Sequence, residues 1–423
     1  MRPFYLAFLL LAPAPAFAYL DPGTGSLLLY AIVGIATTAA FALRNLWYWA
    51  RGRVSLAGAA AVSSRLPDVV FHSEGGKYWQ VFKPALDALL AEGVECAYVS
   101  ADPADPGLAY RASGLRGLRP GGEAATIAWM NAARAALVVS TTPHLDVYML
   151  RRSRGVRRYA HLFHAPTDLC FYEKYAFDWY DCLLTVGPFQ EKSVRELERR
   201  RGTAEKALLP TGCCYFDYML DELGRAPAPG RGKEPVLLYA PAWGVRSSVL
   251  SHGAAIIDGL VDSGFRVLFR PHPQFYVSHK PIIAELERRF SGSSLVEIDR
   301  NRTGIASMSR SDAMVTDLSG VIFDYACLFG RPILLANAEA SPAGQEGEDL
   351  PGPLWDVESA LSLAAARLGP DPGEVGALAR AALSRGGDSA LASRRFREEQ
   401  FYNFGAAGAA AARNIISILG GAA

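Results

Sequence analysis

The amino-acid sequence predicts an α/β protein with two Rossmann-like domains that face a cleft, preceded by an amino-terminal signal or transmembrane segment. Short apolar runs of strand length alternate with helical periods over most of the 423 residues, which is typical of parallel sheets covered by helices on both faces. About 365 residues follow the amino-terminal segment, more than one hydrophobic core usually holds. The stretch from Gly224 to Pro235 is rich in Pro, Gly and basic residues, so it is the expected interdomain linker.

Residues 1–18 have the pattern of a secretory signal peptide. A basic start precedes an apolar run from Phe4 to Leu11, and Ala16-Phe17-Ala18 matches an A-x-A cleavage site. The run is short and followed by prolines, which argues against a membrane span. The sequence leaves open whether this segment is cleaved or stays as half of a helical hairpin.

Residues 19–55 are expected to form a turn, a transmembrane helix and a basic, aromatic flank. The stretch from Ser26 to Leu43 carries no charge and has about the minimum length of a membrane helix. Three arginines and three aromatic residues follow it, a composition typical of the cytoplasmic membrane interface: Arg44, Trp47, Tyr48, Trp49, Arg51 and Arg53. We therefore expect an enzyme tethered to the inner cell membrane, with its catalytic domains in the cytoplasm. The alternative is a secreted soluble protein in which this stretch is a buried helix.

Residues 65–223 are the expected amino-terminal, acceptor-side domain. Five apolar runs predict its strands: Asp68 to His72, Val94 to Ser100, Leu137 to Ser140, Val156 to Phe163 and Cys182 to Val186. The segment from Asp102 to Pro120 is rich in Pro and Gly and is expected to be loop. Ser73 to Lys77 (SEGGK) forms the first turn between strand and helix, and it could also hold an acceptor phosphate.

Residues 234–358 are the expected carboxyl-terminal, nucleotide-donor-side domain. Its predicted strands lie near Val236 to Tyr239, Val267 to Phe269, Leu295 to Ile298, Ala313 to Val315 and Ile333 to Leu335. Residues 359–423 are rich in Ala and predict helices that pack on the outside or return to the first domain.

The overall composition argues against several classes of partner. Forty-three Lys and Arg oppose 42 Asp and Glu, so the chain does not present the basic surface of a nucleic-acid-binding protein. The six cysteines show no metal-ligand spacing and no C-x-x-C pair, which favours a reduced compartment. No cofactor is expected; a divalent metal ion is compatible with the chemistry proposed below but is not indicated by any motif.

The segment from Thr316 to Tyr325 (TDLSGVIFDY) predicts an anion site. It reads as the end of a buried strand, a turn and the start of a helix at Ser319 and Gly320, whose first N–H groups would point at a bound anion. The carboxyl ends of strands are where open α/β sheets hold phosphorylated ligands. The alternative is an ordinary turn capped by Ser319.

A second motif, Arg270-Pro271-His272-Pro273, follows the predicted strand that ends at Phe269. The guanidinium offers a planar fork for phosphate oxygens, and His272 can carry a proton near neutral pH. Prolines on both sides of His272 restrict its backbone. The two motifs are about 45 residues apart, which suits a βα unit between them. The alternative for Arg270 is a solvated side chain on a surface turn.

These motifs, together with Leu238 to Trp243 (LYAPAW), resemble the CDP-glycerol glycerophosphotransferase family. The blocks occur in the family's order and cover roughly residues 160–340. The resemblance implies a GT-B fold and transfer of glycerol phosphate from CDP-glycerol to a hydroxyl of a teichoic-acid-type polymer or lipid-linked acceptor, with release of CMP. The sequence does not distinguish glycerol from another alditol in the CDP-activated donor, or priming from polymerisation.

The resemblance also implies roles for individual residues. His164 best matches the family's acceptor-side histidine, although Phe163 and Ala165 replace the expected Trp and Gly. His164 is thus the expected general base, and His272 would contact a phosphate oxygen or assist the leaving CMP. Arg270, Ser319 and Gly320 would bind the donor pyrophosphate. Asp317 and Asp324 would orient His272 or bind a ribose hydroxyl, or else are carboxylates that favour the start of the helix.

Two other functions remain open from the sequence. One is another GT-B enzyme that uses a nucleotide sugar, either a glycosyltransferase or an epimerase. The other is a non-catalytic, membrane-anchored protein that binds a polymer or a lipid intermediate.

Overall fold

A computed structural model describes residues 66–225, 234–301 and 303–421 of the chain. The predicted signal segment and transmembrane helix, residues 1–18 and 19–55, lie outside the described residues. Among the helices that the structure does describe, none has the length and apolar character needed to cross a membrane.

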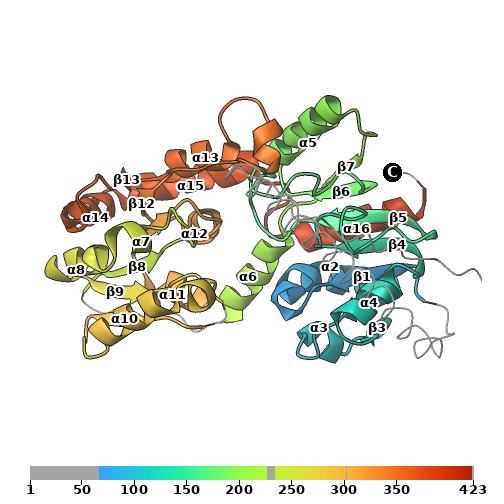
Figure 1. Cartoon of the computed structure of the whole chain (residues 1–423), viewed down its shortest axis with the longest axis horizontal. Coiled ribbons are helices and arrows are strands. Elements are labelled where there is room, and N and C mark those ends of the chain that lie inside the picture. Colours follow the sequence, from blue (N-terminus) through green and yellow to red (C-terminus); the bar gives the residue numbers. More distant parts are fainter. Residues whose placement is uncertain (1–65, 226–233, 302, 422–423) are drawn as a thin grey trace, which may run out of the picture. The chain divides into compact units, whose positions relative to one another are not determined.

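The first parallel sheet has seven strands in the order β3-β2-β1-β4-β5-β6-β7 in the described part of the chain (Figure 1). The strands are β1 (Val69–Ser73), β2 (Cys96–Ser100), β3 (Leu115–Leu118), β4 (Arg134–Ser140), β5 (Gly155–Leu162), β6 (Cys182–Thr185) and β7 (Ala207–Pro210). Five of them match the apolar runs predicted from the sequence. The loop prediction for residues 102–120 was wrong over β3, an edge strand whose sequence, LRGL, lacks a continuous apolar run.

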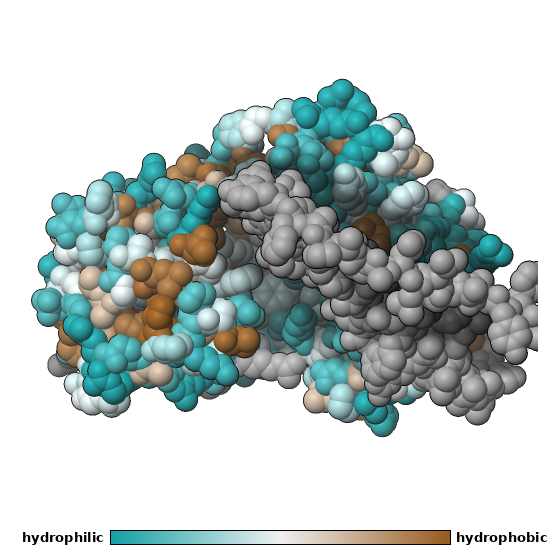
Figure 2. Space-filling view, viewed as in Figure 1, coloured by the Kyte–Doolittle hydropathy of each residue, from teal (hydrophilic) through white to brown (hydrophobic). Residues whose placement is uncertain are grey.

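Helices connect these strands and cover both faces of the first sheet. They are η1 (Gly76–Tyr78), α2 (Trp79–Ala91), α3 (Pro106–Ala109), α4 (Glu123–Met130), α5 (Pro188–Arg201) and α6 (Cys214–Arg225). Buried residues on the two faces of β1 enter different clusters, Val70 on one side and Phe71 with Phe82 of α2 on the other. A strand buried on both faces in this way is typical of a parallel sheet. The exposed surface of α5 is strongly hydrophilic (Figure 2), which agrees with its run of charged residues.

The second sheet is also parallel and has the strand order β10-β9-β8-β11-β12-β13 among the described residues. Its strands are β8 (Val236–Ala240), β9 (Arg266–Phe269), β10 (Val296–Ile298), β11 (Ala313–Asp317), β12 (Ile333–Asn337) and β13 (Ala366–Arg367). The helices between and after them are α7 (Ser248–His252), α8 (Ala255–Asp262), α9 (Phe275–Ser278), α10 (Lys280–Phe290), α11 (Ile305–Arg310), α12 (Val321–Phe329), η2 (Glu346–Asp349) and α13 (Trp355–Leu363).

The last part of the chain is helical and joins both halves. It comprises η3 (Pro372–Glu374), α14 (Val375–Ser384), α15 (Gly386–Gln400) and α16 (Ala407–Leu419). Helix α16 returns to the first sheet, where Ala411 and Ile415 share a buried cluster with Phe82 of α2. Gly408 permits this close packing, because a Cβ there would lie 2.6 Å from the carbonyl oxygen of Pro84.

Each sheet has a point at which the chain reverses the direction of strand addition. In the first sheet this point lies between β1 and β4, and in the second it lies between β8 and β11. Crevices for ligands form at the carboxyl ends of the strands at such switch points. The fold therefore marks two edges, one on each sheet, as candidate sites.

Candidate functional site

The carboxyl edge of the second sheet collects the motifs predicted to bind the donor. Arg270 and His272 follow β9, and Ser319 and Gly320 follow β11. Strand β8 pairs with both β9 and β11 in parallel, so the two motifs emerge at the same edge on either side of β8.

Helix α12 begins directly after Ser319 and Gly320. The Ser319 hydroxyl accepts a 3.5 Å hydrogen bond from the Val321 N–H, and the Ser319 carbonyl accepts one of 3.1 Å from Ile322. Ile322 and Phe323 are buried, which fixes the helix axis against the sheet. The helix starts where the sequence predicts, and the positive end of its dipole at this edge would favour a bound anion.

His272 is held as a neutral hydrogen-bond donor. Its Nδ1 accepts a 3.1 Å hydrogen bond from the Gln274 N–H, so the proton of the neutral ring is on Nε2. Burial, and secondly the charge of Arg270, lower the pKa of His272. The ring also lies 6.0 Å from that of Trp243, centroid to centroid.

Arg270 is oriented by a neighbouring carboxylate. Its Nη1 donates hydrogen bonds to Asp299 Oδ2 at 2.7 Å and to the Asn301 carbonyl at 3.0 Å. Nη2 has no partner among the described residues. The side chain lines a cavity of about 360 Å³, so the guanidinium is fixed in direction and keeps one nitrogen for a ligand.

Asp317 organises the loop after β8. Its Oδ2 accepts hydrogen bonds of 3.0 Å from both the Ala242 and the Ser248 N–H groups, and among the described residues it makes no hydrogen bond to His272. Its Oδ1 is buried without a partner in the same part of the chain, and burial raises the pKa of this carboxyl. Asp317 also borders a cavity of about 400 Å³ with Trp243 and Asn337. Because Asp317 keeps an unpaired acceptor oxygen and makes no hydrogen bond to His272, it is better suited to accept a hydrogen bond from a ribose hydroxyl than to orient His272.

Asp324 is a partly buried residue in the first turn of α12. Burial raises its pKa to about 7, and its Oδ1 has no partner within the described residues. Its charge acts on Tyr215 and Cys213 at the start of α6. Asp324 thus lies close to the first half of the chain, which the sequence did not indicate.

His164 lies at the carboxyl end of β5, between two tyrosines. Its Nδ1 is 3.3 Å from the Tyr172 hydroxyl, and its ring packs edge-on against that of Tyr78 at 5.3 Å. Burial, and secondly the charge of Lys77, lower its pKa to about 4. His164 is therefore neutral at physiological pH and able to accept a proton.

His161, the neighbouring histidine, belongs to the core. It is fully buried and lies among the rings of Phe163, Phe177 and Tyr180 at 4.7–5.1 Å. Both of its ring nitrogens lack a partner in the described structure. His164, by contrast, has a ring nitrogen in contact with the Tyr172 hydroxyl, so it remains the candidate base of the pair.

The loop that carries His164 reaches the start of α12. A Cβ on Gly320 would lie 3.6 Å from Thr167 Cγ2, so the segment three residues beyond His164 lies beside the anion motif. Gln190 fixes this loop by donating a 2.8 Å hydrogen bond to the Thr167 carbonyl. Among the described residues His164 and His272 make no direct contact with each other.

Sequence reasoning missed two polar clusters beside this loop. In the first, the Asp168 N–H donates a 3.2 Å hydrogen bond to Asp356 Oδ1 of α13, and each carboxyl keeps one buried oxygen without a partner in the described structure. Burial raises the pKa of Asp168 to about 6 and that of Asp356 to about 7. These residues are separated by 188 positions, so no local pattern could reveal their contact.

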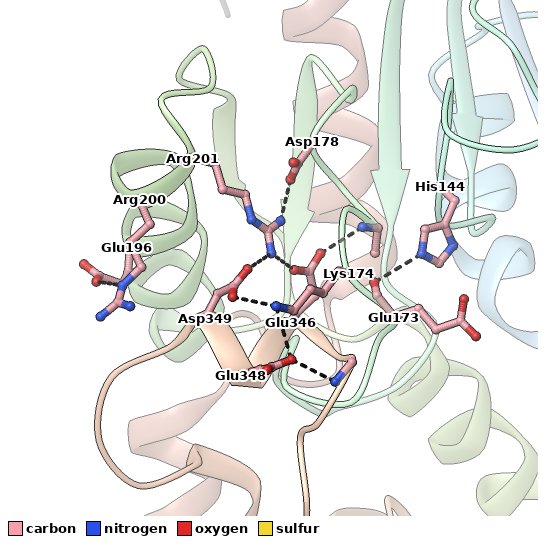
Figure 3. A network of polar contacts seen from close by, with 12 residues as sticks. His144, Glu173, Lys174, Asp178, Glu196, Arg200, Arg201, Glu346, Glu348 and Asp349 are labelled. Atoms are coloured by element: carbon pink, nitrogen blue, oxygen red, sulfur yellow. Dashed lines mark hydrogen bonds and ion pairs between the residues drawn. The ribbon is translucent and has the colours of Figure 1, made fainter. Parts of the chain in front are cut away.

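The second cluster surrounds Arg201 at the end of α5 (Figure 3). Arg201 forms ion pairs with Asp178 at 2.8 Å and Asp349 at 2.7 Å, and a third with the fully buried Glu346. Glu346 also accepts a 2.8 Å hydrogen bond from the Ala176 N–H. The cluster therefore fastens η2 to the loop that carries Tyr172, the partner of His164.

No group of three or more His, Cys, Asp or Glu residues suited to a metal ion occurs in the described ranges. All six cysteines are free and buried.

The predicted site residues lie on two sheet edges, with the donor motifs on the second sheet and His164 on the first.

Comparison with known proteins agrees with this arrangement. Residues 190–345 match the family model of CDP-glycerol:poly(glycerophosphate) glycerophosphotransferase. No curated protein matches the sequence. The matched segment runs from α5 to the start of η2 and includes Arg270, His272, Asp317, Ser319, Gly320 and Asp324.

Solved structures show the same fold at low sequence identity. The wall teichoic acid polymerase TagF is 16% identical, with a TM-score of 0.54 over 84% of this chain and 89% of that chain. The UDP-GlcNAc 2-epimerase of Methanocaldococcus jannaschii, in complex with UDP-GlcNAc and UDP, is 12% identical, with a TM-score of 0.52 over 83% and 99%. The MnaA protein of S. aureus, solved with UDP, is 11% identical, with a TM-score of 0.52 over 85% and 98%.

These likenesses establish an α/β fold with parallel sheets, similar to GT-B glycosyltransferases. The family match confirms the resemblance that the motifs predict: over residues 190–345 the chain is similar to the CDP-glycerol glycerophosphotransferases.

Proposed function

We propose that this protein is a membrane-tethered transferase that moves glycerol phosphate, or a related alditol phosphate, from a CDP-activated donor to a hydroxyl of a cell-envelope polymer or lipid-linked acceptor. The observation that carries the proposal is that Thr167 lies beside Gly320, where an added Cβ would be 3.6 Å from Thr167 Cγ2. It sets the loop of the neutral His164 against the helix start that suits the donor phosphates. The family match over residues 190–345 supports the choice of a CDP-glycerol-type donor.

The transfer needs one proton acceptor and several donors aimed at phosphate oxygens. The tautomer of His164 with its proton on Nδ1, donated to the Tyr172 hydroxyl oxygen, leaves the Nε2 lone pair to take the proton of the acceptor hydroxyl. The acceptor oxygen then bonds to the phosphorus that carries glycerol, and the bond from that phosphorus to the bridging oxygen breaks. CMP leaves with the bridging oxygen and its electron pair.

The residues of the second sheet would stabilise the charge that develops on the donor. The N–H groups of Ser319 and Gly320, which directly precede α12, and the free Nη2 of Arg270 would donate hydrogen bonds to the pyrophosphate oxygens. His272 would donate from Nε2, because its Nδ1 is occupied by the Gln274 N–H. The buried, unpaired Oδ1 of Asp317 would accept a hydrogen bond from the ribose.

Membrane tethering rests on the sequence of residues 1–55. The uncharged stretch from Ser26 to Leu43, with its basic and aromatic flank, supports an anchor in the inner cell membrane and catalytic domains in the cytoplasm. Fractionation of cells that express the full chain tests this part. Recovery in the membrane fraction, with the carboxyl terminus accessible only from the cytoplasm, would support it, and recovery outside the cell would contradict it.

Calorimetric titration of CDP, UDP and GDP into the full-length protein tests the donor site. We expect CDP to bind selectively, and binding to weaken at least tenfold in His272→Ala and Ser319→Ala. Release of CMP from CDP-glycerol in the presence of membranes would then establish turnover. Absence of any nucleotide binding would contradict the assignment of this edge as a donor site.

A second candidate is an enzyme that acts on a nucleotide sugar. The likeness to two UDP-GlcNAc 2-epimerase structures, each with a TM-score above 0.5, favours it over a non-catalytic polymer-binding protein. The same titration separates the two enzymes, because selective binding of UDP would support the one that uses a nucleotide sugar.

A further inference from the structure

The first sheet has its own cavity, at the carboxyl edge that the fold marks as a candidate site. The cavity has a volume of about 640 Å³ and is lined by residues that follow β1, β2 and β4 and by residues of α4. It lies at the switch point between β1 and β4, where open α/β sheets bind ligands. None of the residues assigned above to the donor lines it.

The cavity adjoins the expected base. Lys77 lines the cavity, and its charge is one of the causes that lower the pKa of His164. The ring of the next residue, Tyr78, packs against His164. A molecule in this cavity would therefore lie beside the group that takes the acceptor proton.

The place where a phosphate would bind in this cavity is already taken by a carboxylate. The turn of residues 73–77 precedes η1 and α2, and its N–H groups suggested an acceptor phosphate site. In the structure the Gly76 N–H donates a 3.0 Å hydrogen bond to Asp102 Oδ2, and the Gly75 N–H donates one of 3.2 Å to Ser73 Oγ. The Asp102 carboxylate therefore occupies the position that a bound phosphate would take.

The charges of the lining also disfavour a polyanion. Glu74, Asp102 and Glu123 contribute three carboxylates against the single ammonium of Lys77. His72 adds no positive charge at neutral pH, because burial lowers its pKa to about 4. Each phosphate of a poly(glycerol phosphate) chain would meet like charges here.

The same lining suits hydroxyl groups. Carboxylates accept hydrogen bonds from uncharged hydroxyl groups, so the ligand needs no positive charge to bind them. His72 is only 4% exposed, and its Nδ1 is 3.2 Å from Ser140 Oγ, while its Nε2 has no partner among the described residues.

Two exposed apolar side chains, Tyr148 and Met149, complete the lining. The Tyr148 ring is held in place by the His144 ring at 4.7 Å and by a 3.1 Å hydrogen bond from its hydroxyl to Glu173. His144 is itself fixed by a 3.1 Å contact between its Nε2 and the Glu173 carbonyl (Figure 3). A fixed aromatic face beside hydroxyl acceptors fits the C–H surface of a sugar or polyol.

We propose that this cavity binds the uncharged, hydroxyl-bearing end of the acceptor, a sugar or polyol, and selects against a growing poly(glycerol phosphate) end. The proposal deepens the proposed function by naming the acceptor class, and it rests on the assignment of His164 as the base. The enzyme would thus add glycerol phosphate to a neutral glycan end.

Ligand-observed NMR on the full-length protein without donor tests the cavity independently of catalysis. The probes are methyl β-D-glucopyranoside, as a neutral sugar, and a synthetic glycerol-phosphate trimer. We expect saturation transfer to the sugar and not to the trimer, and at least a fivefold loss of the sugar signal in Tyr148→Ala and Glu123→Lys. Glu95→Lys makes the same charge change at the opposite edge of the sheet and should leave the signal unchanged.

A transfer assay supplies the second arm, with CDP-glycerol and two lipid-anchored acceptors that end in a neutral disaccharide or in the glycerol-phosphate trimer. We expect kcat/KM at least tenfold higher for the disaccharide, and Glu123→Lys to narrow this preference without changing the affinity for CDP. Preferred binding or use of the trimer would overturn the proposal. Sugar binding that survives both cavity variants would also overturn it, whereas loss of CDP binding alone would count against the donor assignment.

Discussion

At the scale of single residues, the sequence marked candidate side chains but not the groups that hold them in place. Arg270 and His272 were predicted from the motif that follows a recognisable strand, and His164 from the resemblance to the family. The partners that tune them were not predicted, since Tyr172, Asp299 and the Gln274 N–H are brought in by loops. Asp317 was predicted as a site residue, but its hydrogen bonds to the 242–248 loop depend on how that loop folds.

Replacement of His164 tests the general base. We expect His164→Ala to lower kcat by about 10²–10⁴-fold, the usual contribution of a positioned base, with the affinity for CDP unchanged. His161→Leu is the matched control, because His161 is buried among aromatic rings and its nitrogens make no hydrogen bond in the described structure. Steady-state CMP release measures both variants. Equal losses in the two would contradict the assignment.

The buried pair of Asp168 and Asp356 predicts a pH dependence of stability. Both folded-state pKa values, about 6 and about 7, lie above the ordinary value of 3.8. The folded protein therefore binds more protons than the unfolded chain, and stability falls as pH rises from about 4 to about 7. Asp356→Asn removes one titrating carboxyl and can donate to the unpaired oxygen of Asp168.

We expect this variant to be more stable than the wild type, by roughly 1–3 kcal/mol at pH 8 and by clearly less at pH 5. Thermal unfolding at the two pH values measures the difference. A gain that is equal at both values, or larger at pH 5, would show that the pair does not titrate as described.

At the scale of elements, the apolar runs predicted the central strands, because these are buried on both faces. Edge strands were harder to predict: β3 has the sequence LRGL and is only partly buried, and β13 has two residues. Helix α12 was predicted from its turn and its period, and the structure adds that Thr167 lies close to its start. This proximity brings together segments far apart in the sequence, so it has no signature in the local pattern.

Gly320 allows the anion site at the start of α12 to be tested separately from folding. Its backbone is helical, with φ −55° and ψ −25°, and a Cβ would meet only Thr167 Cγ2 at 3.6 Å, so Gly320→Ala should be tolerated. Gly320→Asp places a carboxylate at the positive end of the helix dipole, where the donor phosphate would lie. We expect CDP binding to weaken at least tenfold while the melting temperature stays equal or rises.

Calorimetric titration of CDP and thermal unfolding of Gly320→Ala and Gly320→Asp measure these effects on binding and stability. Undiminished CDP binding by Gly320→Asp would place the nucleotide elsewhere, and a large loss with Gly320→Ala would indicate that the segment has no room for any side chain.

At the scale of the whole molecule, the division into two sheets followed from chain length and from the stretch at residues 224–235. The contacts that join the two halves could not be predicted from these features. Arg201, Glu346 and Asp349 each occur in ordinary charged stretches, and their ion pairs join segments 145 and 148 positions apart. The return of α16 to α2 was one of two outcomes left open by the sequence, and its Ala-rich face and Gly408 make that close packing feasible.

The Arg201 cluster predicts a large and asymmetric effect on stability. The side chain of Glu346 is fully buried, and burial raises its pKa even though Arg201 lies beside it. Arg201→Met leaves this carboxylate without its cation, so we expect a loss of about 3–5 kcal/mol in the free energy of unfolding. Arg201→Met combined with Glu346→Gln should recover much of that loss, because the amide oxygen can still accept from the Ala176 N–H.

Denaturant unfolding of these variants measures the differences, with Arg199→Met as the control. The pair that Arg199 forms with Glu196 is exposed, so this substitution should cost less than about 1 kcal/mol. Because the cluster fastens η2 to the loop of Tyr172, Arg201→Met should also lower transferase activity at temperatures where it remains folded, and the double variant should restore both properties together. Recovery of stability without activity would show that the charge of Arg201 contributes to the reaction beyond its structural role.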